Sequence, residues 1–219
     1  MSSQTIAEYA LACVLQHALR LQERRVRDPS QWALSPAPGL VGRTLGLYGF
    51  GGIGQALAHK ALALGMRVLA LRRSDAPLEV PGVARTASLA DLLAASDHLV
   101  LAAPGTAATR HVIDAESLAH ARPGLHLVNV ARGSLVDQEA LRAALDDGRV
   151  GFASLDVAEP EPLPAGHWLY QHPRVQLTPH TCAIGPQVQD ALLDKVLQGL
   201  DALQRGEAPS DLVNLQRGY

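Results

Sequence analysis

A glycine-rich turn, set between a short apolar run and an alanine- and leucine-rich segment, constrains the fold of this chain most. The run Thr44–Tyr48 is short and almost entirely apolar, as expected for a strand buried on both faces. Gly49, Gly51 and Gly54 follow it in the spacing G-x-G-x-x-G, and a helix is predicted from about Ile53. The stretch therefore predicts a strand, a tight turn and a helix.

The three glycines have separate roles in such a turn. The first permits a sharp bend, the second lets the backbone approach a pyrophosphate, and the third lets the helix lie close to the strand. The free N–H groups at the helix start would face the phosphates. A second apolar strand, Arg67–Leu71, follows the helix, as this motif requires. We therefore expect a bound dinucleotide; the alternative is an ordinary turn between a strand and a helix.

Length and composition exclude several other classes of protein. The 219 residues can form one large domain with a real core, and a hydrophobic content of 47% with a net charge of −2 speaks against disorder and nucleic-acid binding. The two cysteines, Cys13 and Cys182, form no disulfide framework, and we expect a cytoplasmic protein. We find no signal peptide and no apolar run of the ~18 residues that a membrane span needs.

Further strands and helices alternate along the chain, which predicts an α/β fold with a Rossmann-type, doubly wound parallel sheet. The strands are near-continuous runs of Val, Leu and Ala, typical of strands covered on both faces. After residues 44–48 and 67–71, strands are expected at 83–86, 98–102, 125–130, 150–155 and 175–177. Helices are expected from Ser2 to about Glu23, from Ser88 to Ala95, over 117–120, after Asp137, and over 186–205.

Several polar or turn-forming residues come directly after predicted strands. They are Arg72, Pro104 with Gly105, Arg132, Asp156 and His180. In a parallel sheet the carboxyl ends of all strands meet at one edge, where ligands bind. We therefore expect these residues to surround one ligand site.

The end of the second strand indicates which dinucleotide is bound. An Asp or Glu at this point would bind the ribose 2′-hydroxyl of NAD, but the chain has Arg72 and Arg73 there. Guanidinium groups can bind a 2′-phosphate, and Ser74 could add a donor. We therefore prefer NADP(H). The alternative is NAD(H), with the arginines facing solvent and Asp75 reaching the ribose.

Three later stretches, together with the glycine turn, resemble the D-isomer-specific 2-hydroxyacid dehydrogenase family. They are Asn129–Asp137, Asp156–Pro162 and Leu177–His180, and the resemblance continues to the final Arg217–Tyr219. It implies that Arg132 holds the carboxylate or keto oxygen of a 2-keto acid. It also implies that His180 is a general acid and base and that Glu161 orients His180. Taken singly, these residues could be a turn arginine, a solvated acid and a capping histidine.

The resemblance also implies further cofactor contacts. Asp156 would contact the nicotinamide carboxamide, and the backbone N–H groups of Gly52 and Ile53 would bind the pyrophosphate. The remaining implied contacts are Pro104, Val130, Ala131 and Ala183. No metal-ligand set is recognisable, and we expect no metal.

Members of this family have a second, substrate-binding domain, most of which precedes the first helix found here. We therefore expect that domain to be largely absent from this sequence. We divide the chain into a dimerisation helix and connector (1–40), a dinucleotide-binding domain (41–185), and a helix and tail (186–219) that would pack toward the missing domain. The resemblance further implies a homodimer.

Two functions remain open. The first is an oxidoreductase, or its cofactor-binding part, that transfers a hydride between NADP(H) and a small 2-keto or D-2-hydroxy acid such as glyoxylate or hydroxypyruvate. The second is a non-catalytic dinucleotide-binding module that acts as a sensor or interaction domain. Neither nucleic acid nor a membrane is an expected partner.

Overall fold

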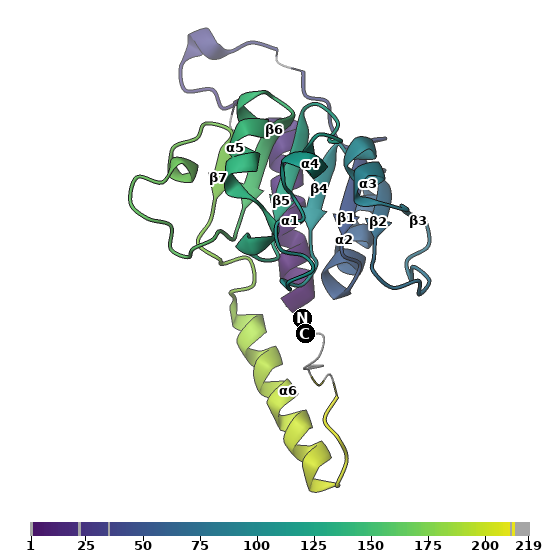
Figure 1. Ribbon diagram of the computed structural model, residues 1–219. Helices are drawn as coiled ribbons and strands as arrows, with labels where there is room; N and C mark the ends of the chain where they lie inside the picture. Colours follow the sequence, from purple (N-terminus) through teal and green to yellow (C-terminus); the bar gives the residue numbers. More distant parts are fainter. Residues whose placement is uncertain (1, 22, 35, 211, 213–219) are drawn as a thin grey trace.

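A seven-stranded, entirely parallel sheet forms the centre of the protein (Figure 1). The computed structural model describes residues 2–21, 23–34, 36–210 and 212. The strand order is β3-β2-β1-β4-β5-β6-β7. The strands are β1 Thr44–Tyr48, β2 Arg67–Leu71, β3 Val83–Arg85, β4 His98–Leu101, β5 Leu125–Asn129, β6 Val150–Leu155 and β7 Val175–Leu177. The order reverses between β1 and β4, which confirms the predicted Rossmann-type sheet.

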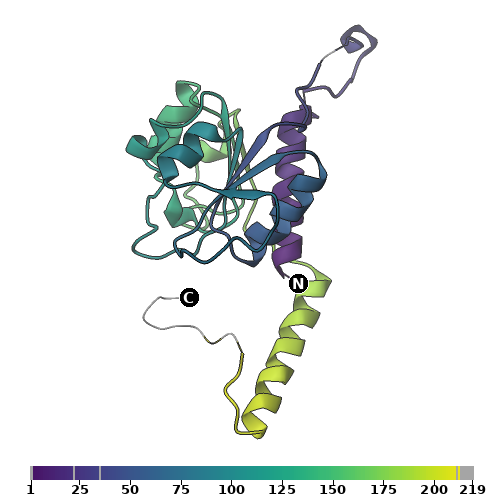
Figure 2. The same ribbon diagram turned by 90° about the vertical axis from the view of Figure 1, so that its right-hand side faces the viewer.

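Helices cover both faces of this sheet (Figure 2). The helices are α1 Ser2–Leu19, α2 Gly52–Ala63, α3 Leu89–Ala95, α4 Ala115–Leu118, α5 Gln138–Asp146 and α6 Pro186–Gln204. One hydrophobic core lies between the sheet and α1 with α2, and a second lies between the sheet and α3, α4 and α5. Side chains of one strand alternate between the cores: Val100 belongs to the first and Leu99 and Leu101 to the second.

Three predicted helix boundaries were wrong: the end of α1 and both ends of α4, which stops at Leu118 and not at His120. α1 ends at Leu19 and not near Glu23, because Arg20 adopts a left-handed conformation (φ 51°) and the N–H of Leu21 turns back to the carbonyl of Gln16. α4 begins at Ala115, two residues before the predicted start. The side chain of Asp114 caps it by accepting the N–H of Ser117, while Ser117 accepts the N–H of Asp114.

The last helix, α6, extends away from the sheet (Figures 1 and 2). Its apolar side chains are more than half exposed at Leu192, Leu193, Val196, Leu197, Leu200 and Leu203. The terminal residues Arg217–Tyr219 and residue Ser35 of the connector lie outside the described residues.

None of the helices in the described part of the chain combines the length and the apolar character that a membrane crossing demands. The same residues contain no group of three or more His, Cys, Asp or Glu side chains arranged to hold a metal ion.

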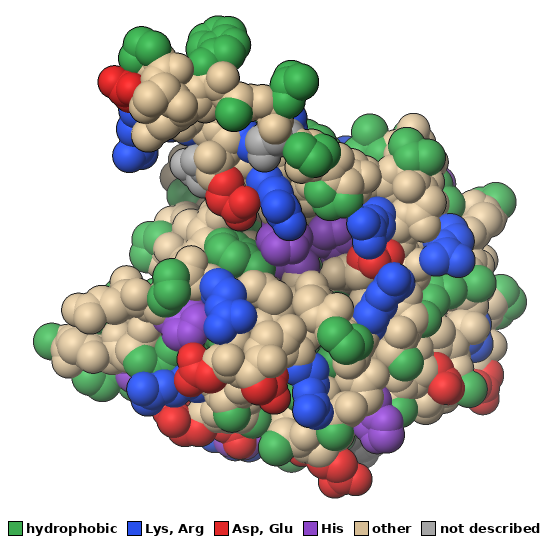
Figure 3. Space-filling model, turned by 90° about the horizontal axis from the view of Figure 1, so that it is seen from above, with side chains coloured by type: hydrophobic (Ala, Val, Ile, Leu, Met, Phe, Trp, Pro, Cys, Tyr) green, Lys and Arg blue, Asp and Glu red, His purple; other side chains and the backbone are tan. Residues whose placement is uncertain are grey.

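Three histidines are packed together at the amino ends of the central strands. His98 and His126 share a hydrogen bond between their Nδ1 atoms (3.0 Å), and Nε2 of His126 contacts Oγ of Ser154 (3.0 Å). The ring of His17 stacks on that of His126 with 4.3 Å between centroids. Seen from above, histidine side chains lie in a hollow bordered by basic side chains (Figure 3). Burial lowers the pKa of all three, that of His98 to about 4.

This cluster predicts a loss of stability in mild acid. An unfolded histidine binds a proton below about pH 6.5, whereas the buried neutral ones do not, so the free energy of unfolding falls as the pH drops from 6.5 toward 4. His98 alone contributes about 3 kcal/mol over this range. Carboxylates with lowered pKa, such as Asp97 and Asp156, lose their contribution only below about pH 4. Urea unfolding at pH 7.5, 6.5, 5.5 and 4.5 measures the slope, which His98→Leu should reduce. An equal slope in the variant would contradict the prediction.

Candidate functional site

The three glycines of the turn between β1 and α2 occupy different steric environments. A Cβ on Gly49 (φ 101°) would lie 2.7 Å from the backbone nitrogen of Ala103, and one on Gly54 would lie 2.7 Å from the carbonyl oxygen of Gly49. A Cβ on Gly51, in contrast, would meet nothing within 4 Å among the described residues. The first and third glycines are thus required by packing, while the second leaves the backbone accessible to a ligand.

The start of α2 fits an anionic group. Gly51 caps this twelve-residue helix and has no side chain to accept the first N–H groups. These N–H groups and the positive end of the helix dipole both face the carboxyl edge of the sheet. The turn therefore fits the pyrophosphate of a dinucleotide, with Gly52 and Ile53 in the first helical turn as the predicted donors.

Arg72, directly after β2, forms an ion pair at the end of the strand. Its Nη1 lies 2.8 Å from Oε1 of Glu79 and 3.2 Å from the carbonyl oxygen of Pro77. Gln55, in α2, donates to the other oxygen of Glu79 (3.1 Å). Hydrogen bonding from Arg72 lowers the pKa of Glu79. Arg72 is therefore held beside the start of α2.

Arg85, at the end of β3, is a residue that the sequence analysis missed. It donates to the carbonyl oxygens of Ser74 (3.0 Å) and Ala76, and so fixes the loop that follows Arg72 and Arg73. Register places Arg85 beside Ala70 of β2. A third arginine at the end of the third predicted strand was the available signal.

Arg132 lies at the turn that follows β5. The buried side chain of Asn129 shapes this turn, because its Oδ1 accepts the N–H of Ala131 (3.0 Å) and its Nδ2 donates to the carbonyl of Arg132 (2.9 Å). Arg132 is exposed and passes close to Gly105, where a Cβ would lie 2.9 Å from Cγ of Arg132. The structure thus brings Arg132 beside the Pro104–Gly105 turn, as predicted from their positions after strands.

The next residue, Gly133, joins this turn to the loop after β6. A Cβ on Gly133 would lie only 2.0 Å from the carbonyl carbon of Ala158, so the two backbones meet directly. The N–H of Ala158 donates to Oε1 of Glu161 (2.9 Å), and Oε2 of Glu161 lies 2.8 Å from Nδ1 of His180. One continuous set of contacts therefore connects Arg132, Glu161 and His180.

The pair of Glu161 and His180 is partly exposed to solvent. Desolvation raises the pKa of Glu161, but the hydrogen bonds from Ala158 and His180 outweigh it, so the pKa is lowered and the group is ionised at neutral pH. An ionised carboxylate only accepts hydrogen bonds, so Nδ1 of His180 carries the hydrogen and Nε2 remains for a ligand. This arrangement is that of an oriented acid–base histidine.

His180 has a left-handed backbone conformation, with φ 54°. Such a conformation is unfavourable for a non-glycine residue and persists where its surroundings fix it. Here the N–H of His180 donates to the carbonyl of Asp156 (2.8 Å) and to that of Thr178 (3.0 Å).

Asp156 follows β6 and is almost completely buried (1% exposed). Its carboxylate accepts from Oγ1 of Thr178 (2.6 Å) and from the N–H groups of Thr181 (3.0 Å) and Cys182 (3.0 Å). Desolvation raises the pKa of Asp156, but the hydrogen bonds together outweigh it, so the pKa is lowered from its usual value. Asp156 thus organises the loop that carries His180; its contact with the nicotinamide stays a prediction.

The remaining predicted residues surround the same edge of the sheet. Val130 and Ala131 are buried, Ile53 and Ala183 are half-buried, and Pro104, Arg132 and Ser74 are exposed. Burial raises the pKa of Cys182 to about 12, so its thiol stays protonated and is no nucleophile.

Comparison with known proteins agrees with this geometry. Residues 10–182 match the family model for the D-isomer specific 2-hydroxyacid dehydrogenase, NAD binding domain. A glyoxylate reductase of Korarchaeum cryptofilum is 37% identical over 97% of this chain and 66% of its own length.

Two solved structures resemble the chain closely. A D-isomer specific 2-hydroxyacid dehydrogenase of Xanthobacter autotrophicus Py2, in complex with NADPH and MES, has a TM-score of 0.90 at 33% identity, covering 100% of this chain and 90% of that one. An NADPH-dependent glyoxylate/hydroxypyruvate reductase of Sinorhizobium meliloti, in complex with NADP and sulfate, has a TM-score of 0.88 at 29% identity, covering 99% of this chain and 70% of that one.

The chain belongs to the D-isomer-specific 2-hydroxyacid dehydrogenase family and contains its NAD(P)-binding domain. The family assignment from the sequence motifs is confirmed. The chain spans about half to two thirds of the length of the curated relatives that it matches.

Proposed function

We propose that this chain is the cofactor-binding and catalytic part of an NADP(H)-dependent reductase of small 2-keto acids, such as glyoxylate or hydroxypyruvate. The continuous set of contacts from Arg132 through Gly133 and Ala158 to Glu161 and His180 carries this proposal. It supports the proposal because a cationic side chain and a histidine with an oriented ring lie at the edge of the sheet where the glycine turn also lies. The similarity to a glyoxylate reductase and a glyoxylate/hydroxypyruvate reductase supports the substrate class.

Each side chain has a distinct task in this reaction. Arg132 binds the substrate carboxylate or keto oxygen through charge-assisted hydrogen bonds and draws electron density from the carbonyl. Nε2 of His180 gives a proton to the keto oxygen in reduction and takes it back in oxidation. Glu161 holds the ring of His180 in position by accepting the hydrogen of Nδ1. The nicotinamide, when bound, supplies or accepts the hydride.

NADP(H) is the preferred cofactor because cationic groups gather at the end of β2. Arg72 lies there in an ion pair with the exposed side chain of Glu79, and because solvent weakens such a pair, a phosphate can compete for the guanidinium. Arg85 holds the loop that carries Arg73 and Ser74. Two similar structures contain NADPH or NADP, which supports this preference.

Titration with NADPH and NADH, followed by fluorescence, tests the cofactor assignment. The wild-type chain should bind NADPH more tightly than NADH. Arg72→Ala should weaken NADPH binding about tenfold to a hundredfold, because a hydrogen bond to a charged group is lost, and should leave NADH binding unchanged. As a control, Gly51→Ala should keep the thermal stability, since its Cβ meets open space, yet weaken binding of both cofactors. Equal wild-type affinities would contradict the preference for NADP(H).

The alternative function is a non-catalytic dinucleotide-binding module that serves as a sensor or interaction domain. Such a module does not need the hydrogen bond between Glu161 and His180 or the exposed Arg132. The presence of both favours the enzyme.

Turnover of glyoxylate or hydroxypyruvate with NADPH separates the two functions. The reductase proposal predicts measurable turnover, a loss of kcat of about 10²- to 10⁴-fold in His180→Gln, and a comparable loss of kcat/KM in Arg132→Ala. Cofactor titration of the same variants controls for loss of the fold. Cofactor binding by the wild type with turnover equal to that of His180→Gln would favour the module.

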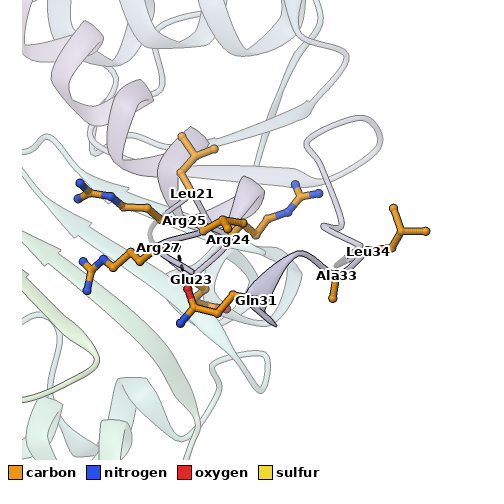
Figure 4. A pocket seen from close by; sticks show the side chains of 9 residues that line it. Leu21, Glu23, Arg24, Arg25, Arg27, Gln31, Ala33 and Leu34 are labelled. Atoms are coloured by element: carbon orange, nitrogen blue, oxygen red, sulfur yellow. Dashed lines mark hydrogen bonds between the residues drawn. The ribbon is translucent and has the colours of Figure 1, made fainter. Parts of the chain in front are cut away.

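We also propose a homodimer formed through α1 and the connector up to residue 40. The connector, which includes the short helix Pro29–Gln31, leaves the body of the protein and exposes Trp32 (83% exposed) and Leu34. Arg24 points to the opposite side from Arg25 and Arg27 (Figure 4), so these arginines form no shared anion pocket. Exposed apolar groups on an extended segment are typical of a surface that a second copy covers.

A cleft beside β7, with a volume of about 1130 Å³, lies next to this segment. It is lined by apolar side chains such as Phe152 and Val175 and also by Glu161 and His180, so it belongs to the proposed catalytic site and stays open to a substrate. The division into units 1–40, 41–185 and 186–219 stays a proposal, and so does the packing of α6 against a substrate domain.

Light scattering tests the dimer. The expected mass is twice the 23.2 kDa of one chain, and Trp32→Ser should shift the equilibrium toward the single chain because it removes apolar area from the interface. Arg24→Ser, which removes an exposed charged side chain from the same segment and little apolar area, is the matched control and should leave the mass unchanged. A single-chain mass for the wild type at micromolar concentration would overturn the proposal.

A further inference from the structure

We propose that Tyr9, in the first helix, is a positioning residue for His180. It acts through Thr178 and Asp156, and the proposal rests on the catalytic role proposed for His180. Tyr9 lies 169 positions before Thr178 in the chain, outside every motif that identified the site.

A directed chain of hydrogen bonds connects Tyr9 to the loop of His180. Oη of Tyr9 lies 2.5 Å from Oγ1 of Thr178, and Oγ1 of Thr178 donates to Oδ1 of Asp156 (2.6 Å). Thr178 has one hydroxyl hydrogen, and the carboxylate of Asp156 can only accept. The hydroxyl of Tyr9 must therefore donate to Thr178. Burial raises the pKa of Tyr9, so this hydroxyl keeps its hydrogen.

Asp156 connects Thr178 to His180 and to the two residues that follow it. Its carboxylate accepts the N–H groups of Thr181 and Cys182, and its carbonyl accepts the N–H of His180 (2.8 Å). These contacts fix the loop while His180 is in its unfavourable left-handed conformation (φ 54°). Loss of the hydrogen bond from Tyr9 would therefore loosen this loop and let the ring of His180 move away from Glu161.

Tyr9, at the other end of this series of hydrogen bonds, is held in place because α1 is part of the hydrophobic core. Ala7 and Ala10, on either side of Tyr9, are both 0% exposed. Hydrogen bonds between partly buried groups connected in series reinforce one another. A rigid helix on one face of the sheet thus sets the position of a side chain at the edge.

A second contact between α1 and the segment formed by β7 and Thr178 provides a matched control. Nε2 of Gln16, two turns after Tyr9, donates to Oε1 of Gln176 (3.0 Å) in the middle of β7. Its loss removes one polar contact between the same two elements, but it does not touch Thr178 or Asp156.

The experiment compares Tyr9→Phe, Thr178→Val, Thr178→Ser and Gln16→Leu by steady-state kinetics and by NMR. The ¹H–¹³C signal of the His180 ring is assigned with His180→Gln, and Glu161→Gln marks its position without the carboxylate. We expect Tyr9→Phe and Thr178→Val to shift the signal toward that position. They should also lower kcat about tenfold to a hundredfold, with the KM for NADPH unchanged. Thr178→Ser retains a hydroxyl and should behave as wild type, and so should Gln16→Leu.

An unchanged His180 signal in Tyr9→Phe would overturn the proposal, and so would an equal shift in Gln16→Leu. The NMR comparison decides the matter even without turnover. Failure of the proposed reductase function would appear separately, as equal turnover by the wild type and His180→Gln.

Discussion

The parallel direction of all seven strands is the constraint on which the rest of the structure depends. Parallel strands require connections across the faces of the sheet, so helices cover both faces and most of the strand side chains are apolar. The side chains that could meet a ligand therefore lie where the strands end. Because the carboxyl ends share one edge, Gly49, Arg72, Arg132, Asp156 and His180 gather there although 131 positions separate the first from the last.

Two buried polar side chains give this edge its local shape. Asn129 ends β5 and holds the turn of Arg132, and Asp156 follows β6 and holds the loop of His180. Both side chains are about 1% exposed. The hydrogen bonds described for them are all made with backbone groups or with the hydroxyl of Thr178. Burying such groups is costly unless they are hydrogen-bonded, so each has one favourable arrangement. The position of the exposed groups that meet a ligand thus depends on buried groups that do not.

Much of the fold was predictable because its signals are local. The turn of Gly49 to Gly54 and the start of the helix after Asp137 each depend on residues within one turn of chain, and the structure confirms them. The end of α1 was missed because Arg20 takes a conformation usually reserved for glycine. Arg85 was missed because its role depends on β3 lying beside β2, and strand order is a property of the whole sheet.

The sequence by itself determined the fold class, the dinucleotide turn and the family, because strand periodicity, glycine spacing and ordered motifs are written along the chain. It also named Arg132, Glu161 and His180 through the family resemblance. Only the tertiary structure decided how these residues are connected: that Gly133 meets Ala158, that Ala158 donates to Glu161, and that Tyr9 reaches the same loop. Such contacts join residues far apart in the chain, and packing, rather than local propensity, sets the distance between them.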